Sequence, residues 1–309
     1  RQRRDVSMKR LLAVALLWSL AGPCRGLECK PLVPAATPAA FAVGKYAQGL
    51  LFRISKAGVP PSHIFGTIHL GDPRVLDLPR VVSSSFEQSR RFVMEAVLDE
   101  AGIAEFSKLM FYGDATSFKA QVGAELAGAA EPLLARYGIT AEIAHRIKPW
   151  AAYMTLSVPP PSSLLPLDLA LMQRAKAHGM AISGLESLAE QAGALGDLRL
   201  EDQIALLKDA VCHYELLQQD IEPLTALYLK RDLGGLMALA GKYQTRSAHY
   251  YQRFLDSLLW KRNRRMAARV RPWLKEGNTF VALGALHLVG DKGVLALLEQ
   301  ARYRVTRLY

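Results

Sequence analysis

Two histidines stand in the same short motif near opposite ends of the 309-residue chain. Gly66-Thr67-Ile68-His69 and Gly284-Ala285-Leu286-His287 each continue an apolar run, and a Gly-Asp pair follows soon after each histidine. The glycine permits close approach of backbone or ligand, and the histidine stands where a strand would end. Two such elements in one sheet would bring two imidazoles to one rim. A single histidine in this context is more often a satisfied core or turn residue.

A glutamate interrupts an apolar run between the two motifs. Residues 91–98 predict a strand, and alternation places Glu95 on the face of Val93 and Val97. A buried, unpaired carboxylate is unfavourable, so Glu95 there needs a cation, a metal ion or a raised pKa. On an edge strand its carboxylate would instead reach water. Two imidazoles and a carboxylate are a common ligand set, so His69, Glu95 and His287 are candidate ligands of one Zn²⁺, Mn²⁺ or Co²⁺ ion.

A basic segment offers a partner for that carboxylate. Arg262 lies on an apolar stripe at helical spacing, formed by Leu255, Leu259, Met266, Val270 and Trp273. Its guanidinium either extends outward to water or points into the site. In the second case it would fix Glu95 or stabilise a developing oxyanion, which makes Arg262 a candidate catalytic residue beside Glu95.

Other polar residues and motifs have simpler explanations or are absent. Asp168 and Glu186 each stand near the start of an expected helix, where capping accounts for them. The sequence has no GxGxxG, GxSxG or HExxH motif. Three cysteines are too few for a structural metal site made of cysteine alone.

The elements that must position these residues follow from hydrophobic patterning. Residues 49–55 and 63–69 predict a hairpin around a Gly/Pro turn, and 79–88 a short helix. Residues 181–185, 279–283 and 303–308 predict strands, and 294–300 a helix. Helical patterns fill 100–180 and 187–247, with a loop at 158–163. The long basic segment 249–271 is expected to stop or kink at Pro272. The sequence therefore predicts one α/β domain, whose mixed β-sheet is built from N- and C-terminal strands around a large helical middle segment.

Composition and the N-terminal segment define the expected domain organisation. Half of the residues are hydrophobic and 22% are charged, which excludes disorder, collagen-like repeats and a disulfide-dense mini-domain. Residues 1–26 combine a basic start, an apolar core and small residues near the end, as a secretory signal peptide does. Residues 27–45 are a Pro/Ala-rich tether, and 46–309 form the folded domain.

Export to the periplasm or out of the cell follows from that signal peptide. A lipoprotein anchor at Cys24 is less favoured, because Pro23 occupies a position where small residues are wanted. Translation could start at Met8, which Lys9-Arg10 follow, or at a residue upstream of it. In an oxidising compartment Cys29 and Cys212 could form one disulfide, although the sequence cannot show their proximity.

The basic charge is local. Of the net charge of +11, residues 1–26 contribute +5 (six bases against one acid) and residues 249–276 contribute +6 (eight bases against two acids). The basic face at 261–275 is most simply a solvated surface. Export disfavours nucleic acid as a partner, whereas peripheral contact with a membrane or an anionic polysaccharide stays open.

The ordered motifs resemble one known family. Besides the two Gly-x-x-His elements and the glutamate between them, the shared segments are Lys148-Pro149-Trp150, Leu167-Asp168, Gln173–Ala177, Gly184-Leu185-Glu186 and Arg262–Met266. Together they resemble the TraB/GumN family, which includes the Tiki-type metalloproteases, from about Leu51 to Tyr309. The resemblance implies an α/β fold. For the Tiki branch it also implies a divalent-metal-dependent peptidase that uses His69, Glu95 and His287.

The sequence thus favours an exported metal-dependent hydrolase that acts on peptide or protein substrates through a metal-activated water. The alternatives are a peptide-binding or sequestering protein without turnover, and an accessory factor for envelope polysaccharide. The enzyme needs both imidazoles, whereas a binder would keep its affinity without either.

Overall fold

The computed structural model describes residues 27–30, 44–242 and 248–309. The predicted signal peptide, residues 1–26, lies outside the described residues, as do residues 31–43 of the predicted tether. Those two assignments stay predictions. Among the described residues, none of the helices is long and apolar enough to cross a membrane.

The described strands form one mixed, six-stranded sheet in the order β4-β3-β5-β2-β1-β6. Their bounds are β1 Leu51–Lys56, β2 Val59–Thr67, β3 Arg91–Met94, β4 Ala181–Gly184, β5 Thr279–Gly284 and β6 Arg304–Arg307. Strands β2, β3, β4 and β5 run parallel, whereas β1 is antiparallel to both β2 and β6. The predicted single α/β domain with a mixed sheet is confirmed.

The hairpin is tighter than the sequence pattern predicts. The turn contains only Ala57 and Gly58, whose φ of 74° suits glycine. Pro60 and Pro61 fall inside β2, but the register skips from Ser62 opposite Ile54 to Val59 opposite Lys56. The two prolines therefore sit at an irregularity, where no ladder hydrogen bond requires their missing N–H groups.

Strand β5 forms the centre of the core. Thr279 to Leu283 are all buried, and this continuous apolar run is typical of a strand covered on both faces. Phe280 packs against Phe65, Phe86 and Phe92, with ring centroids 5.2–6.5 Å apart. Phe86 comes from α2 (Arg80–Glu87), so this aromatic cluster fastens the helix to the sheet.

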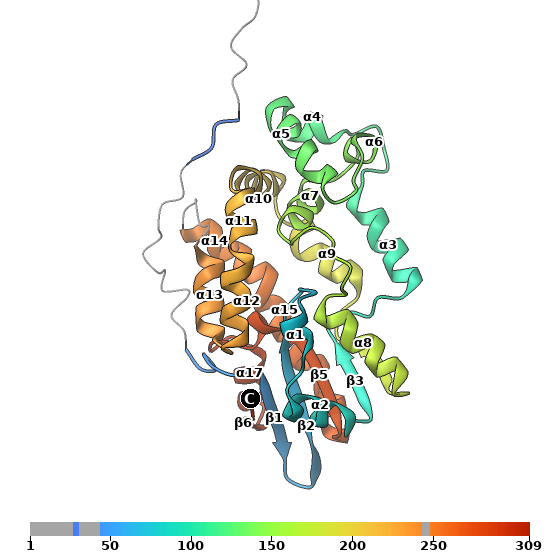
Figure 1. Cartoon of the computed structure of the whole chain (residues 1–309), viewed down its shortest axis with the longest axis vertical. Coiled ribbons are helices and arrows are strands. Elements are labelled where there is room, and N and C mark those ends of the chain that lie inside the picture. Colours follow the sequence, from blue (N-terminus) through green and yellow to red (C-terminus); the bar gives the residue numbers. More distant parts are fainter. Residues whose placement is uncertain (1–26, 31–43, 243–247) are drawn as a thin grey trace, which may run out of the picture.

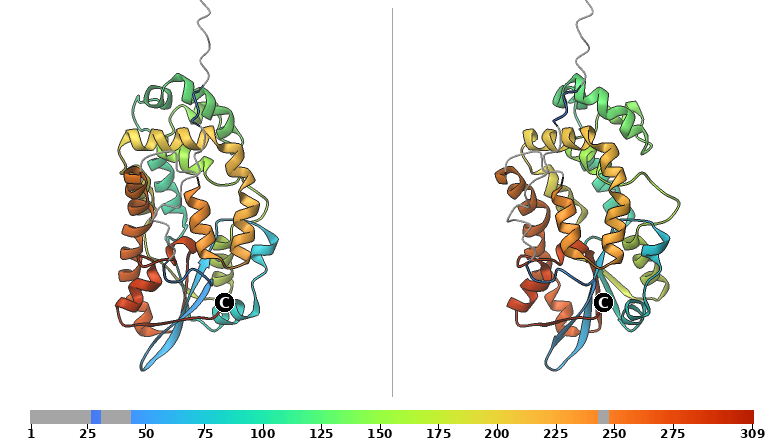
Figure 2. Two further views of the ribbon diagram at one scale, coloured as in Figure 1. Left: turned by 90° about the vertical axis from the view of Figure 1, so that its left-hand side faces the viewer. Right: turned by 60° about the vertical axis from the view of Figure 1, so that its left-hand side comes forward.

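Helices cover both faces of the sheet (Figure 2). Helices α2 and α8 (Leu167–Ala177) lie on one side, with α1 (Pro73–Leu76) beside them. The other side carries α15 (Lys261–Arg269), α16 (Arg271–Glu276) and α17 (Val294–Gln300).

The helical middle segment stacks beyond one end of the sheet (Figure 1). Its first half comprises α3 (Glu100–Met110), α4 (Phe118–Val122), α5 (Ala124–Ala135), α6 (Ala141–Ala144), α7 (Pro149–Leu156) and α9 (Leu188–Gly196). Its second half comprises α10 (Leu200–Cys212), α11 (Tyr214–Gln219), α12 (Ile221–Leu229), α13 (Leu233–Gly241) and α14 (Ala248–Leu255). These helices lie on the side to which β2, β3, β4 and β5 direct their carboxyl ends.

The basic segment is a broken helix. A π-helical turn, η2 (Asp256–Trp260), separates α14 from α15, and α15 ends at Arg269. The predicted break at Pro272 is confirmed, because α16 begins at Arg271 with the proline in its first turn, where no N–H is needed. Single-turn π segments recur at functional sites, and this one ends at Trp260, two residues before Arg262.

A disulfide joins Cys29 to Cys212, with their Cα atoms 5.5 Å apart. It connects the first described residues, 27–30, to the last residue of α10. The sequence left this pairing open, and the structure supplies it.

Candidate active site

The carboxyl ends of the parallel strands bring the chemistry-bearing side chains together. His69 follows β2, Glu95 follows β3, Glu186 follows β4, and His287 lies in the 3₁₀ turn η3 (Ala285–His287) after β5. Adjacent parallel strands end side by side, and this edge is where open α/β sheets commonly bind ligands. The structure therefore brings His69, Glu95 and His287, each singled out in the sequence, to one edge.

Glu95 lies just outside β3 rather than within a longer strand. The strand ends at Met94, because Glu95 leaves the ladder and its carbonyl accepts from Glu186 N–H at 2.7 Å. The edge-strand interpretation is wrong: β3 lies between β4 and β5, and the Glu95 side chain is only 13% exposed.

The Glu95 carboxylate is held on both oxygens. Gly284 N–H donates to Oε1 at 2.6 Å, while Arg262 Nη2 at 2.6 Å and Gln191 Nε2 at 3.3 Å donate to Oε2. Burial raises the pKa of Glu95, but His287, Arg262, His69 and the Gly284 N–H outweigh it and lower the pKa to about 2. Glu95 is therefore a fixed carboxylate at neutral pH.

Arg262 points inward, so the interpretation that it extends to water is wrong. Its side chain is 9% exposed, and Nε donates to Glu186 Oε2 at 2.9 Å. Nη1 donates to the Leu258 carbonyl at 3.3 Å, and Nη2 to Glu95. Burial lowers the pKa of Arg262, but Glu95 and Glu186 more than offset this and raise it. With an acceptor on each nitrogen, Arg262 fits the role of fixing Glu95 better than that of receiving an oxyanion.

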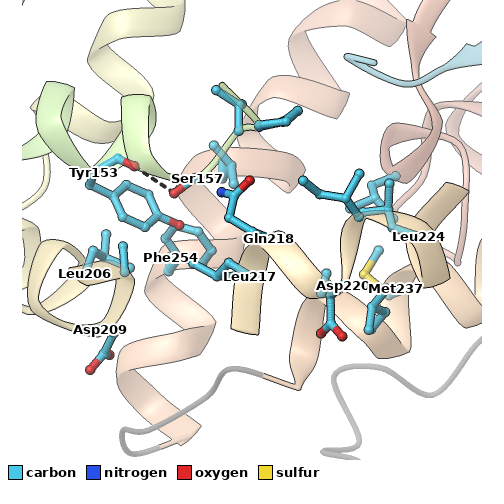
Figure 3. Close-up of a pocket in the computed structure, with 18 of the residues that line it drawn as sticks. Tyr153, Ser157, Leu206, Asp209, Leu217, Gln218, Asp220, Leu224, Met237 and Phe254 are labelled. Carbon is cyan, nitrogen blue, oxygen red and sulfur yellow. Dashed lines mark hydrogen bonds between the residues drawn. The ribbon is translucent and has the colours of Figure 1, made fainter. Parts of the chain in front are cut away.

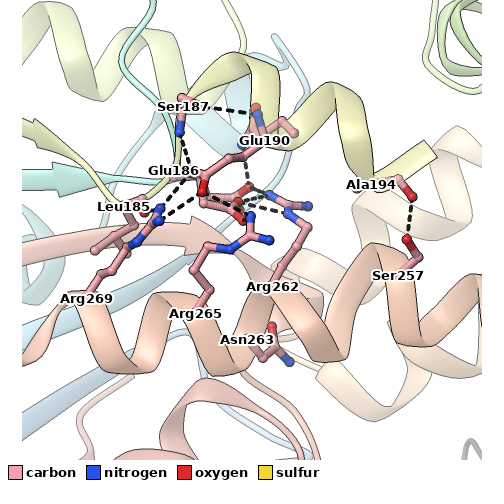
Figure 4. Close-up of polar contacts among 12 residues, drawn as sticks. Leu185, Glu186, Ser187, Glu190, Ala194, Ser257, Arg262, Asn263, Arg265 and Arg269 are labelled. Carbon is pink, nitrogen blue, oxygen red and sulfur yellow. Dashed lines mark hydrogen bonds and ion pairs between the residues drawn. The ribbon is translucent and has the colours of Figure 1, made fainter. Parts of the chain in front are cut away.

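Glu186 is the anchor of this network and not a helix cap. Ser187 caps α9, whereas the Glu186 side chain is fully buried between Arg262 and Arg265 (Figure 4). Arg265 Nη1 donates to Glu186 Oε1 at 2.9 Å. The two guanidiniums compensate the charge of the Glu186 carboxylate, which would otherwise be costly to bury.

His287 has one defined tautomer. Asn263 donates from Nδ2 to the Lys292 carbonyl at 2.9 Å, so its Oδ1 accepts from His287 Nδ1 at 2.5 Å. The Nε2 lone pair then faces Glu95 Oε1, 3.6 Å away. Burial lowers the pKa of His287 to about 4, with Arg262 and His69 adding to this and Glu95 opposing it. The imidazole is therefore neutral at pH 7.

His69 is held in the same manner by Asp168. Its Nδ1 lies 2.6 Å from Asp168 Oδ2, and Thr67 Oγ1 donates to the other carboxylate oxygen. The charge of Asp168, together with its hydrogen bond, raises the pKa of His69 to about 9. Its side chain stays 64% exposed. Asp168 does stand in the first turn of α8, but its carboxylate serves the β2 motif rather than capping the helix.

The glycines of both motifs allow neighbouring groups to approach the backbone closely. A Cβ on Gly284 would lie 3.1 Å from Glu95 Oε1, and one on Gly66 would lie 3.0 Å from Leu288 Cδ1. The sequence interpretation of these glycines is confirmed.

The donor chemistry suits a divalent ion, although the described residues contain no group of three or more His, Cys, Asp or Glu arranged to hold one. Both imidazoles have Nδ1 tied to an acceptor. Nε2 of the neutral His287 is left for another partner, whereas His69, with its pKa of about 9, must release a proton from Nε2 before that atom can bind an ion. Metal-binding histidines have this arrangement, with an outer carboxylate or carbonyl fixing ring and tautomer. We therefore keep His69, Glu95 and His287 as the ligand set to be tested.

Asp168, Glu186 and Asn263 are the residues whose roles the patterning missed. Each has its partner far away in the sequence, so neither spacing nor periodicity could pair them. A signal was nevertheless present: all three stand in the segments that carry the family resemblance.

Comparisons with known proteins agree with that resemblance. The model of the TraB/PrgY/gumN family matches residues 50–307. The chain is also 28% identical to Metalloprotease TIKI2 of Danio rerio over 163 residues, which cover 45% of this chain and 32% of that protein. The match thus spans about a third of the curated relative. No solved structure matches.

Proposed function

We propose that this chain, which belongs to the TraB/PrgY/gumN family, is a divalent-metal-dependent hydrolase of peptide bonds. The observation that carries the proposal is the pair of imidazoles flanking a buried glutamate, each fixed through Nδ1 by its own acceptor. The similarity to a metalloprotease supports the choice of peptides as substrates.

His69 and His287 would hold the ion through Nε2, and Glu95 through a carboxylate oxygen. A divalent ion bound there would polarise the scissile carbonyl and lower the pKa of a water molecule towards neutrality. Glu95 stays ionised and oriented because Arg262 and Gly284 hold it. It is thus placed to bind the ion and to orient an attacking water. Arg262 is a positioning residue, since its contacts are with Glu95, Glu186 and the Leu258 carbonyl.

Metal content tests the site without requiring a substrate. We expect about one ion per chain in the untagged protein after loading with Zn²⁺, Mn²⁺ or Co²⁺, measured by inductively coupled plasma mass spectrometry. His69→Ala and His287→Ala should lose it, while His145→Ala, at an exposed histidine after α6, should keep it. Equal metal content in all four proteins would exclude these imidazoles as ligands.

Peptide cleavage tests the reaction itself. A mixture of synthetic peptides, incubated with each metal and read by mass spectrometry, should show cleavage that a chelator abolishes. Glu95→Gln should reduce the rate at least about a hundredfold, because it removes the carboxylate charge that holds the ion and the attacking water in position. Unchanged cleavage in Glu95→Gln would refute the mechanism.

A peptide-binding protein without turnover is the second candidate, favoured by a largely apolar cavity beside the site. Such a protein would bind the same peptides and leave them intact, with affinity unchanged in His69→Ala and His287→Ala. Measuring cleavage and binding of the same peptides by the parent protein and by the two histidine variants therefore separates the two candidates.

We also propose export to the periplasm or beyond, which the disulfide supports because such bonds persist in oxidising compartments. A membrane or an anionic polysaccharide is the surface partner that we propose for the basic face at 261–275. Lys261 and Arg264 pair with Asp256, and Arg265 and Arg269 with Glu190. This pairing reduces the charge left to attract a membrane or an anionic polymer. Salt-insensitive binding to anionic vesicles would count against a role for the face.

A further inference from the structure

An apolar cavity of about 330 Å³ lies beside the site, within the helical segment (Figure 3). This volume is at the lower end of the range for small-molecule pockets. Its walls are mainly leucines and other apolar side chains from α7, α10, α11, α12, α13, α14 and η2. Leu206, Leu217, Leu224, Met237 and Phe254 represent five of these helices.

The cavity reaches the site through the residues next to the two histidines. Leu70, which follows His69, and Leu286, which precedes His287, both line it. Leu258 lines it too, and the Leu258 carbonyl accepts from Arg262. A group in the cavity would therefore lie beside whatever is bound between the two imidazoles.

The wall is tied to the histidine motif by a buried hydrogen bond. Tyr228 of α12 donates its hydroxyl to the Gly66 carbonyl at 2.8 Å, and Tyr228 is 3% exposed. Leu224 stands one helical turn earlier on α12 and lines the cavity. Cavity and site are thus parts of one packed unit.

The charges around the cavity favour a neutral occupant. Among the described lining residues, the ionisable acids are Asp209 and Asp220, and no lysine or arginine is present. Lys242 pairs with Asp220 at 2.8 Å. The carboxylate of a fatty acid would find no cation among the described lining residues, whereas an uncharged side chain requires none.

We propose that this cavity is the subsite for one large apolar side chain of a peptide substrate, next to the bond that is cleaved. The proposal rests on the proposed function for its substrate class. Burying a leucine side chain in the cavity is favourable, whereas burying a polar side chain there is not. The protein should therefore select leucine or phenylalanine at one position of the peptide.

Binding and cleavage are measured separately, on two dansylated hexapeptides that differ only in Leu or Ser at one central position. By fluorescence anisotropy the Leu peptide should bind at least about tenfold more tightly. Leu224→Asn should abolish this preference, and so should Leu217→Asn on the neighbouring helix. Leu229→Asn, on α12 but outside the lining, should retain it. Thermal melts monitored by circular dichroism verify that each variant is folded.

Each outcome decides one of the two proposals. Preference without cleavage would keep the subsite and overturn the proposed peptidase. Cleavage without preference, or a preference that survives in both Leu224→Asn and Leu217→Asn, would overturn the subsite. Equal binding of both peptides together with binding of decanoate would assign the cavity to an acyl chain, which also overturns the peptide subsite.

Discussion

At the scale of single residues, the candidate site depends on the side chains that hold the candidate ligands in place. Asp168 and Asn263 each fix one imidazole through Nδ1, and Arg262 fixes the carboxylate between them. None of the three is a candidate ligand. Each determines which atom its partner can present and in which protonation state, so each can be tested apart from the ligands themselves.

Removing an outer partner should weaken metal binding without removing a ligand. We expect Asp168→Ala and Asn263→Ala to bind Zn²⁺ about 10–100-fold more weakly, because the imidazole loses its orientation and tautomer. Competition titration with a chromophoric chelator measures this. Asp114→Ala, at an exposed aspartate before α4, provides the control and should bind normally. Normal affinity in the first two variants would mean that the rings are held by other contacts.

Arg262 should also matter for stability. Arg262→Met leaves the buried carboxylates of Glu95 and Glu186 without their shared partner, which should lower the free energy of unfolding by about 3 kcal/mol. Urea denaturation measures the loss. On the same helix, Arg264 is 57% exposed and lies 3.6 Å from Asp256, so Arg264→Met should cost less than about 0.5 kcal/mol. Similar losses of unfolding free energy in Arg262→Met and Arg264→Met would contradict the assignment of Arg262 as the buried arginine of the pair.

At the scale of elements, α9 begins on a charged junction beside the site. Ser187 and Glu190 form a capping box, and Arg269 of α15 donates two hydrogen bonds to Glu190 at 2.7 and 2.8 Å. These contacts fasten the start of α9 to the basic helix, one turn away from the buried Glu186. The junction thus holds β4, α9 and α15 in their mutual positions.

The junction predicts a pH dependence of stability. Hydrogen bonding to Arg269, against a smaller effect of burial, lowers the pKa of Glu190 from 4.5 to about 2. Because the folded-state pKa is depressed, the stabilisation is complete above about pH 4.5 and is lost as the pH falls towards 2. Glu190→Gln keeps a capping acceptor and removes the charge. Its deficit in unfolding free energy, measured by urea denaturation, should be present in full at pH 6 and be much smaller at pH 2.5.

Arg269→Gln should reproduce that behaviour, since it removes the other half of the pair. A deficit of the same size at both pH values would show that Glu190 acts through packing rather than charge.

How far the sequence predicts these elements depends on whether a feature is local. Hydrophobic patterning predicted β1, β2, β4, β5 and β6, and Pro272 predicted the break before α16, because each of these features depends on neighbouring residues. It placed Glu95 inside a strand because the apolar residues 96–98 continue the pattern after β3 ends. The strand ends there through contacts with Gly284 and Glu186, which periodicity cannot reveal.

The candidate ligands could likewise be found from local sequence patterns, whereas the residues that hold them in place could not. His69 and His287 could be found because their motifs repeat, and Arg262 because it interrupts an apolar stripe. Asp168 and Glu186 were assigned as caps from their position alone. Their actual partners, Thr67 and His69 for Asp168 and Arg262 and Arg265 for Glu186, come from other elements.

At the scale of the whole molecule, one covalent link ties the N-terminal side of the domain to the helical segment. The bond between Cys29 and Cys212 spans 183 residues of sequence, so it closes most of the chain into a loop. A cross-link over so long a loop restricts the unfolded ensemble strongly, and it should contribute about 3 kcal/mol or more to stability.

Reduction should therefore lower the melting temperature, measured by scanning calorimetry with and without dithiothreitol. The double variant Cys29→Ser/Cys212→Ser should melt at the lower temperature in both conditions, because it has no bond to reduce. The proposed metal site lies at the sheet edge and does not include either cysteine, so metal content should be the same in both proteins at temperatures where both are folded. A melting temperature insensitive to dithiothreitol in the parent protein would show that the link adds nothing to stability. Loss of metal on reduction would instead show that the helical segment positions the site only while the link holds it.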